Sequence, residues 1–527
     1  MNEPNSTQIR NIVLLSHTGA GKTMLAESML NAAGVSTRMG SVEDGTTVSD
    51  YEPEESKRGS SIQLSVLRCP WKSNQFNLLD TPGYADFRGE VISGVRVADS
   101  ALIVVSAPSS VEVGTQQMWK IADQNDLPKI VYVSKMDREN ADFQKVVDDL
   151  TERFGRQCVP LTIPIGSEDN FSGVIDLLDS KAQIPDGLES SVESFRELLT
   201  EAIAEADDDL ATKYLEGDTL TDDELKKGLK SGIAAGNIVP ILSGDSQSKN
   251  GIDELMNALA EYMPSGESVI VASDKSGESV ELKGDSKSKL AALVFKTTAD
   301  PFVGKLSYFR VYSGTLRSDS QIWNSNTEES ERIGQIFHIT GKTQEPATSL
   351  SAGDIGAVPK LNSVLTGHSI CEKESEITID GFEFPSPVYN RAVYPKSKAD
   401  VDKMTTSLAR IVEEDPSIAL EREPNTLEML MGGLGDTHID ITVEKIKRKF
   451  GVELELALPK VPYMETISKS ATVEYKHKKQ SGGHGQYGHV YLSLEPLSRG
   501  SEFEFASAVV GGSVPKEYIP SVEKGVN

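Results

Sequence analysis

Short apolar runs alternate with turns and helical stretches over the first 135 residues. The runs include "IVLL", "FNLLDTPG", "ALIVVSA" and "KIVYVSKMD". Short β-rich runs that alternate with helices are typical of a parallel sheet covered by helices on both faces. The pattern therefore predicts an α/β domain, which we assign to residues 1–270.

The pattern changes at residues 189–224, inside an insert that we place at about 165–240. Glutamates recur every fourth residue from Glu189 to Glu205, and three aspartates follow at 207–209. The window holds thirteen acidic and two basic residues, a net charge of −11. Charges at this spacing are typical of a solvated helix face. An acidic docking surface is the alternative interpretation.

The rest of the chain divides by composition. Residues 264–288 are rich in Ser, Gly, Lys and Glu, and we assign 271–288 as a linker. Short strands with Gly and Asn turns predict a small β-barrel over 289–375. Strand, helix, strand and helix alternate over 385–461, which indicates a ferredoxin-like α+β domain. Residues 462–527 carry "KKQSGGHGQYGH" and end without a closing element.

Length and charge limit the possible functions. A chain of 527 residues should form several domains, because single cores stop growing near ~250–300 residues. The net charge of −27 argues against a protein whose whole surface binds nucleic acid. The three cysteines lack the spacing of disulfide frameworks or zinc sites, and no stretch suits a signal peptide or membrane span. We therefore expect a cytoplasmic protein.

A phosphate-binding loop is indicated by "SHTGAGKT", residues 16–23. An apolar strand precedes it and the helical "MLAESMLNAAG" follows, so backbone N–H groups at the helix start could hold phosphates. Lys22 would meet the β- and γ-phosphates, and the Thr23 hydroxyl would bind Mg²⁺. Ser16 replaces the first glycine of the usual pattern, but the turn-forming Gly21 is retained.

Two further motifs make the nucleotide GTP. In "LLDTPGY" a strand would deliver Asp80 to the metal, and the N–H of Gly83 could meet a γ-phosphate. In "SKMD", Lys135 could stack on a purine while Asp137 accepts from its N1–H and exocyclic amine, a donor pair of guanine and not of adenine. Three such motifs in this order, each at the end of a strand, indicate a GTP-binding domain.

With these motifs the chain resembles elongation factor G, a translational GTPase that drives translocation on the ribosome, and in particular its divergent relatives. The stretches "PIGSEDNFSGVIDL", "ADPFVGKLSYFRVYSG", "EEDPSIAL", "KQSGGHGQYGHV" and "GGSVPKEYIPSVEKG" match the family in order. The resemblance implies a P-loop GTPase domain with a helical insert, a translation-factor β-barrel domain II, a ferredoxin-like domain III and a partial S5-like α+β domain IV. It also favours docking of the acidic insert on stalk proteins.

The resemblance implies these site residues. Tyr84, Lys22 and Gly83 stand at the catalytic positions, and Thr23, Ser61 and Asp80 at the Mg²⁺ positions. GTP or GDP would contact Ser16, His17, Thr18, Gly19, Ala20, Gly21, Lys22, Thr23, Asp80, Thr81, Pro82, Gly83, Tyr84, Ser134, Lys135, Met136, Asp137, Ser243 and Gly244. Implied partners are the factor-binding site of the ribosome with its stalk proteins and ribosomal RNA, and indirectly tRNA and mRNA. We expect a monomer with no membrane partner.

Four of these positions depart from the family pattern. Ser61 replaces a threonine but keeps its hydroxyl, Gly19 stands where an aspartate is frequent, and Ser134 replaces the asparagine that supports the base. Tyr84 replaces the histidine that orients the attacking water. Since positioning and electrostatic stabilisation supply most of the catalysis in phosphoryl transfer, this change should lower the rate far more than the affinity. The alternative is that Tyr84 only packs under the switch.

Three functions therefore remain open. The chain could be a GTPase that couples hydrolysis to movement of tRNA and mRNA, a slow or non-hydrolysing ribosome-associated regulator, or a ribosomal protection factor. The Gly- and Lys-rich stretch 476–489, which includes Gly482, suits a loop that approaches RNA phosphate. A metal site of His477, His484 and His489 is disfavoured, because their spacing is not helical and no cysteine is near. The chain stops inside the fourth domain, so we expect a fragment or a truncated form.

Overall fold

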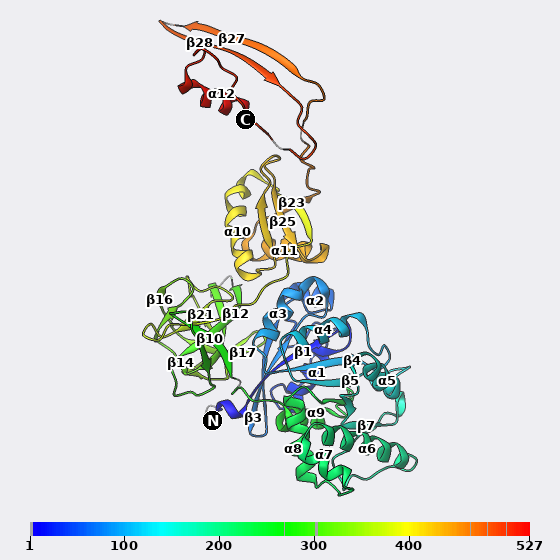
Figure 1. The fold of residues 1–527 in the computed structure, drawn as a ribbon. Coiled ribbons are helices and arrows are strands. Elements are labelled where there is room, and N and C mark those ends of the chain that lie inside the picture. The colour runs from blue at the N-terminus through cyan, green and yellow to red at the C-terminus, as the bar shows by residue number, and fades with distance from the viewer. Residues whose placement is uncertain (1–3, 268, 301–303, 464, 482, 502) are drawn as a thin grey trace. The chain divides into compact units, whose positions relative to one another are not determined.

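The computed structural model describes residues 4–267, 269–300, 304–463, 465–481, 483–501 and 503–527, and for residues 300, 399, 481 and 484 only the main chain. Two units, residues 1–459 and 460–527, are each described by themselves. Figure 1 shows the order of the elements.

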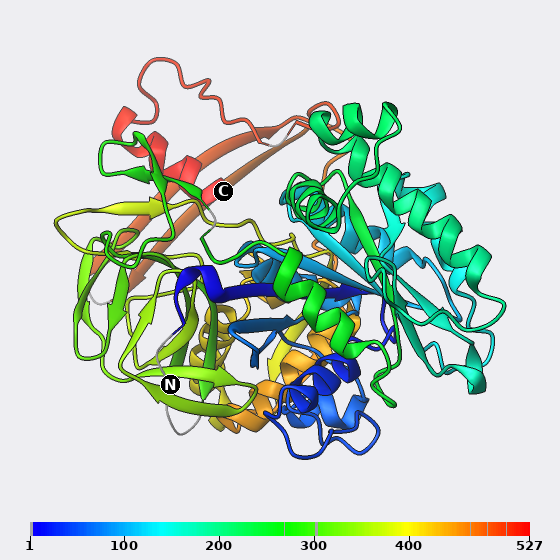
Figure 2. The ribbon, with the colours of Figure 1, turned by 90° about the horizontal axis from the view of Figure 1, so that it is seen from below.

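The α/β domain is built on a seven-stranded sheet in the order β2-β3-β1-β4-β5-β9-β6 (Figures 1 and 2). All neighbours pair in parallel except β2 and β3. The central strands are buried along their whole length, which is why they read as unbroken apolar runs in the sequence. Their bounds are β1 (Ile9–Ser16), β2 (Ser65–Trp71), β3 (Asn74–Asp80), β4 (Ser100–Ser106), β5 (Lys129–Ser134), β6 (Cys158–Pro160) and β9 (Val239–Ser243).

Helices cover both faces of this sheet. Helices α1 and α9 pack together against it, and α3 and α4 form a second layer. Trp119 of α4 stacks on Phe154 of α5 with ring centroids 3.9 Å apart, which joins these two helices. The helices are α1 (Lys22–Ala32), α2 (Pro53–Arg58), α3 (Arg88–Arg96), α4 (Val113–Gln124), α5 (Phe143–Phe154) and α9 (Ile252–Tyr262).

The acidic window is helical, as its four-residue spacing predicted. It forms α6 (Glu189–Glu205), α7 (Asp208–Leu215) and the start of α8 (Asp222–Ala234), next to the hairpin β7 (Thr162–Ile165) and β8 (Gly173–Asp176). Helix α6 buries Val192, Leu199 and Ile203. Its five regularly spaced glutamates are all exposed, which fits a solvated face.

The segment expected to be a linker contains regular structure. Strands β10 (Ile270–Asp274) and β11 (Ser279–Leu282) pair with each other, and β10 also pairs with β22 (Ile377–Ile379). In β11 the apolar positions Val280 and Leu282 alternate with polar ones, and they pair with Ala272 and Ile270 across a Gly turn, a hairpin pattern that the Ser- and Gly-rich composition masks. Composition alone is therefore a poor guide in this stretch.

The domain that follows is all antiparallel β. Its main sheet has the order β16-β15-β21-β12-β13-β20-β17-β18, and β14 pairs with β19. The bounds are β12 (Ala291–Asp300), β13 (Gly304–Ser313), β14 (Thr315–Arg317), β15 (Gln321–Asn324), β16 (Glu329–Arg332), β17 (Ile336–Thr340), β18 (Thr343–Ala347), β19 (Ser349–Ser351), β20 (Ile355–Pro359) and β21 (Ser369–Cys371). A second apolar core, which includes Phe309 and Val358, fills this domain.

The third domain is a split βαβ unit, as the sequence pattern indicated. Its sheet has the order β24-β25-β23-β26 and is covered by α10 and α11. The bounds are β23 (Tyr389–Pro395), α10 (Val401–Glu414), β24 (Ala419–Arg422), β25 (Met429–Gly433), α11 (Asp436–Phe450) and β26 (Leu454–Ala457). The short strands β24 and β26 complete the ferredoxin-like arrangement.

The second unit contains the long hairpin β27 (Ala471–Ser481) and β28 (His484–Leu494), seen as two long strands in Figure 2, and helix α12 (Ile519–Val526). The register places Lys476 opposite His489 and Lys478 opposite Tyr487. Gly482 lies outside the described residues. His477 contacts Gln486 and His489 contacts Glu474, so each of these two histidines has a hydrogen-bond partner that is not a metal.

Buried polar side chains join the α/β domain to the antiparallel domain. Arg310 of β13 donates to the Val97 carbonyl (2.8 Å) and to the Asp99 carboxylate. Asp99 also accepts from the main-chain N–H (3.1 Å) and side-chain amide (2.8 Å) of Asn11. The same Asn11 amide donates to the Gly353 carbonyl at 2.8 Å.

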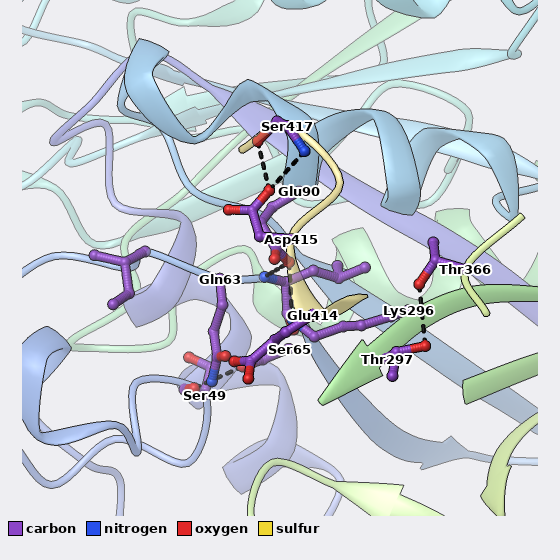
Figure 3. Close-up of polar contacts among 12 residues, drawn as sticks. Ser49, Gln63, Ser65, Glu90, Lys296, Thr297, Thr366, Glu414, Asp415 and Ser417 are labelled. Atoms are coloured by element: carbon purple, nitrogen blue, oxygen red, sulfur yellow. Dashed lines mark hydrogen bonds and ion pairs between the residues drawn. The ribbon is translucent and has the colours of Figure 1, made fainter. Parts of the chain in front are cut away.

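A second polar cluster lies where three domains meet (Figure 3). Lys296 of β12, which is 4% exposed, donates to the Leu64 carbonyl and to Glu90 of α3, both at 2.8 Å. From the third domain, Asp415 accepts a hydrogen bond from His438 at 2.8 Å. The segment after α2 thus touches the second domain by its main chain.

Candidate nucleotide-binding site

The residues of the first motif form the loop between β1 and α1. Gly19 and Gly21 have φ values of 80° and 99°, in the left-handed region that favours glycine, so the loop needs them to turn into the helix. Lys22 is 6% exposed and donates to the Ser16 hydroxyl at 2.6 Å. Burial lowers the pKa of Lys22 to about 8, although Asp80 and Asp50 act to raise it. A buried lysine with this environment is suited to an anion.

Three oxygen groups from three separate segments converge beside Lys22. The Thr23 hydroxyl lies 3.1 Å from the Ser61 hydroxyl and donates to Oδ2 of Asp80 at 3.2 Å. Oδ1 of Asp80 is buried and accepts no hydrogen bond from the described residues. Burial raises the pKa of Asp80, while Lys22 and Thr23 act to lower it.

This cluster fits a hard divalent cation. Hydroxyl and carboxylate oxygens are typical ligands of Mg²⁺. A buried carboxylate oxygen that accepts no hydrogen bond carries a negative charge that a cation could neutralise. No group of three or more His, Cys, Asp or Glu side chains that could hold a metal occurs in the part of the chain that the structure describes. The convergence of Thr23, Ser61 and Asp80 makes these three residues candidates for magnesium ligands.

Gly83 packs directly against the phosphate loop. A Cβ atom at this position would be 2.9 Å from the Lys22 ammonium and 3.0 Å from Cα of Thr18, so any other residue would push the two segments apart. Thr81, fully buried beside Pro82, donates to the Leu14 carbonyl at 2.6 Å and fixes this segment to β1. Gly83 is thus placed next to the lysine that would hold the γ-phosphate.

The residues predicted to recognise the base lie at the ends of β5 and β9, at the same edge of the sheet. Ser134 is buried and donates to the Ala20 carbonyl at 2.6 Å, and Lys135 donates to the Gly19 carbonyl at 2.6 Å, so both residues support the phosphate loop. The Met136 N–H donates to the Gly244 carbonyl at 3.4 Å, which joins the two segments predicted to bind the base. In parallel α/β sheets, ligands bind outside the carboxyl ends of the strands.

Asp137 is poised to accept hydrogen bonds. Its Oδ1 has no donor among the described residues, and burial together with Asp245 raises its pKa. The Ser243 hydroxyl is likewise buried without a described partner. Buried polar atoms without a partner are expected where a polar ligand ring supplies the missing hydrogen bonds.

Profiles of known families match most of the chain, one after another in order. They are the elongation factor Tu GTP binding domain at residues 7–265, elongation factor G domain 2 at 289–373, domain III at 384–458 and domain IV at 459–527. A crystal structure of a protein from Thermus thermophilus is similar with a TM-score of 0.87 and 33% sequence identity, over 99% of this chain and 77% of that one. The chain belongs to the elongation factor G family of translational GTPases.

Membership confirms the resemblance and the fold class inferred from the sequence. Members of the elongation factor G family act on the ribosome, and their GTPase domain implies binding and hydrolysis of guanine nucleotide. No helix in the described ranges has both the length and the apolar character needed to cross a membrane.

Tyr84, one of the four positions at which we expected a departure from the family pattern, is half-exposed. Its side chain is 41% exposed and its ring lies 6.2 Å from that of Phe87, tilted by 45°. The contact with Phe87 supports a packing role, and the exposure leaves the phenol free to meet a ligand. His17, next to Ser16, lies 3.5 Å from Glu112 at the start of α4.

Sequence reasoning missed three buried carboxylates of this site. Asp50 is 4% exposed, and burial together with Asp80 raises its pKa to about 7. Glu27 of α1 accepts the N–H groups of Gly40 (3.0 Å) and Val48 (2.5 Å). Glu55 is fully buried on α2. For Asp50 and Glu55 the signal in the sequence was the acidic stretch "SDYEPEES" ahead of Ser61, which is typical of an ordinary surface helix start.

Proposed function

We propose that this elongation factor G family member binds GTP with Mg²⁺ and hydrolyses it on the ribosome, coupled to translocation of tRNA and mRNA. The observation that carries the proposal is the convergence of Thr23, Ser61 and Asp80 beside Lys22 and Gly83. These residues come from the phosphate loop and from the segments on either side of β2 and β3. A nucleoside triphosphate with its metal would touch all of them.

The chain's own groups divide the work. Lys22 and the Gly83 N–H would bind γ-phosphate oxygens and stabilise the negative charge that develops on them. Thr23, Ser61 and Asp80 would hold Mg²⁺, which when bound neutralises phosphate charge. Lys135, Met136 and Asp137 would bind the guanine, together with Ser134, Ser243 and Gly244. Tyr84 would orient water through its phenol, although it cannot carry the charge of an imidazolium.

The domain contacts support coupling between the nucleotide and the rest of the chain. Arg448 of α11 donates to Glu54 of α2 at 2.7 Å, and Ile441 packs with Ile62 and Phe87. The third domain therefore contacts α2 with the turn after it, and also the segment after Gly83, and these are the two segments that would face the nucleotide. Hydrolysis would release these segments and, with them, the arrangement of the first three domains.

The proposed partners rest on exposed surface. The acidic face of α6 would dock on the ribosomal stalk, and the Lys- and Tyr-bearing hairpin β27–β28 would approach ribosomal RNA. Tyr475, Tyr487 and Tyr491 are each more than 60% exposed in their unit. We propose a cytoplasmic monomer.

The alternative is a slow or non-hydrolysing regulator that uses GTP as a ligand, and Tyr84 is the observation that favours it. Single-turnover GTP hydrolysis, with and without ribosomes, separates the two. The assay would compare the protein with Tyr84→His, and would use Lys22→Ala to show that binding depends on the phosphate loop. Ribosome-stimulated turnover in the unaltered protein supports the GTPase. Ribosome binding without turnover, rescued by histidine, supports the regulator. A ribosomal protection factor would instead release a bound drug from stalled ribosomes.

A further inference from the structure

The turn that carries Ser61 is held from both sides by one residue, Glu55. Helix α2 ends at Gly59, whose φ of 63° lies in the left-handed region, and the N–H groups of Gly59 (2.8 Å) and Ser60 (3.3 Å) donate to the Glu55 carbonyl. Beyond Ser61, the N–H groups of Ile62 (3.0 Å) and Gln63 (3.3 Å) donate to Oε1 of the Glu55 side chain. The four N–H groups around Ser61 therefore converge on Glu55.

Helix capping uses only one of the two oxygens of the Glu55 carboxylate. Oε2 of Glu55 accepts the N–H of Glu52 at 3.1 Å, which completes the capping box at the start of α2. Oε1 has no part in the cap, and among the described residues it accepts from the two residues after Ser61. Glu55 is 0% exposed, and burying a carboxyl group is costly unless its hydrogen bonds are made.

The geometry connects Glu55 to the cation site through Ser61. The Ser61 hydroxyl lies 3.1 Å from the Thr23 hydroxyl, which also contacts Asp80 at the end of β3. Ile62 is buried against Phe87 and Ile441, so the chain just after Ser61 is fixed by a side chain as well as by Glu55. A turn fixed on both sides leaves the Ser61 hydroxyl few directions in which to point.

We propose that Glu55 is a positioning residue, which sets the Ser61 hydroxyl toward the metal and the γ-phosphate by accepting the Ile62 and Gln63 N–H groups. The inference rests on the proposed role of Ser61 in binding nucleoside triphosphate. Glu55 itself touches neither metal nor nucleotide in this account. Its removal should therefore affect the triphosphate state and spare the diphosphate state, which lacks the γ-phosphate.

The test compares two affinities in the presence of Mg²⁺, that of a non-hydrolysable GTP analogue and that of GDP, by titration calorimetry. Glu55→Ala should weaken analogue binding at least about tenfold, the size expected for losing two amide hydrogen bonds to one oxygen, and change GDP binding less than about twofold. Glu55→Gln keeps one acceptor oxygen and should restore most of the analogue affinity. Glu55→Asp, whose carboxylate is withdrawn by one methylene, should behave like alanine.

Matched controls separate positioning from general damage. Lys57→Ala lies on the same helix, is 70% exposed and should change neither affinity. In Ser61→Ala, a further Glu55→Ala change should add little to the loss of analogue binding, because Glu55 acts through Ser61. Full additivity of the two changes would overturn the inference, as would equal losses of GDP and analogue binding.

The two proposals fail in different ways. If Ser61→Ala leaves the ratio of the two affinities unchanged, the role assigned to Ser61 in the proposed function is wrong. If Ser61→Ala lowers the ratio but Glu55→Ala and Glu55→Asp do not, only the positioning role is wrong. Should Glu55→Ala bind neither nucleotide, Glu55→Asp decides alone, and an unchanged ratio there refutes the inference.

Discussion

Arg310 offers the sharpest test of how the first two domains are joined. It projects from β13 of the antiparallel domain into the α/β domain, where its guanidinium contacts Asp99 and the Val97 carbonyl and lies 4.5 Å from the Tyr312 ring centroid. The side chains of Arg310 and Asp99 are 2% and 0% exposed. We expect Arg310→Met to weaken the contact between the two domains, because it removes the guanidinium that contacts the buried Asp99 carboxylate.

The size of the effect follows from the contacts that remain. Breaking a buried ion pair by removing one partner costs about 3–5 kcal/mol. Asp99 keeps two hydrogen bonds from Asn11, at 2.8 and 3.1 Å, so the loss should lie at the lower end, about 3 kcal/mol. Removing the charge as well, in Arg310→Met with Asp99→Asn, should recover at least about 1 kcal/mol, since no unpaired ion is then buried.

Guanidinium unfolding followed by tryptophan fluorescence measures this loss. The chain has three tryptophans, of which Trp71 and Trp119 report on the α/β domain and Trp323 on the antiparallel domain. Single-tryptophan versions should unfold together in the unaltered protein. In Arg310→Met the transitions should move to lower denaturant and separate.

The exposed pair Arg332–Asp319 is the control, because its N–O distance is 3.6 Å and both side chains are about three-quarters exposed. Arg332→Met should change stability by less than about 0.5 kcal/mol. If Arg310→Met costs no more than Arg332→Met, burial does not govern the strength of these pairs and the reasoning is refuted.

Three further outcomes are expected. Gly341→Ala should destabilise the protein more than Gly451→Ala in thermal unfolding: both have positive φ, but a Cβ at Gly341 would lie 2.1 Å from the Val48 carbonyl while Gly451 faces open space, so equal losses would contradict the contact. Burial acts to raise the pKa of Asp415, but the His438 hydrogen bond outweighs it and holds the pKa at about 2, below the 3.8 of a free side chain. This carboxylate therefore stabilises the fold above about pH 4, and the stability is lost as the pH falls toward 2. With 23% of the Asp415 side chain exposed, we expect it to contribute about 1 kcal/mol to the free energy of unfolding. Urea unfolding at pH 5 and at pH 3 measures how far this free energy falls with pH, and Asp415→Asn should reduce that fall by the same amount. Lys22→Ala should abolish the stabilisation of the protein by GDP in a melting assay, and a preserved shift would show that phosphates bind elsewhere.

The α/β core and the ends of its strands were predictable because they depend on local patterns. Buried parallel strands need apolar residues on both faces, so β1, β4 and β5 are visible as unbroken runs, and the polar residues after them fall at one edge by topology. The helices of the ferredoxin-like domain were visible for the related reason that their apolar positions recur with the helical period.

The contacts between distant segments were not predictable in this way. Glu55, Lys296 and Arg310 look like surface residues in the sequence, and each is buried by a partner that lies far away in the chain or across a tight turn. The hairpin β10–β11 was obscured for a different reason, because four residues of alternation are too few to outweigh a Ser- and Gly-rich composition.

The buried hydrogen bonds between the first two domains also determine which fragments of the protein should fold. Asn11 and Asp99 are buried residues of the α/β domain, and their hydrogen bonds are completed by Gly353 and Arg310 of the neighbouring domain. A fragment that ended near residue 270 would leave these buried groups facing solvent or unpaired. The smallest self-sufficient GTP-binding piece should therefore include the antiparallel domain. Nucleotide binding and the fold of that domain are, in this sense, properties of one cooperative body.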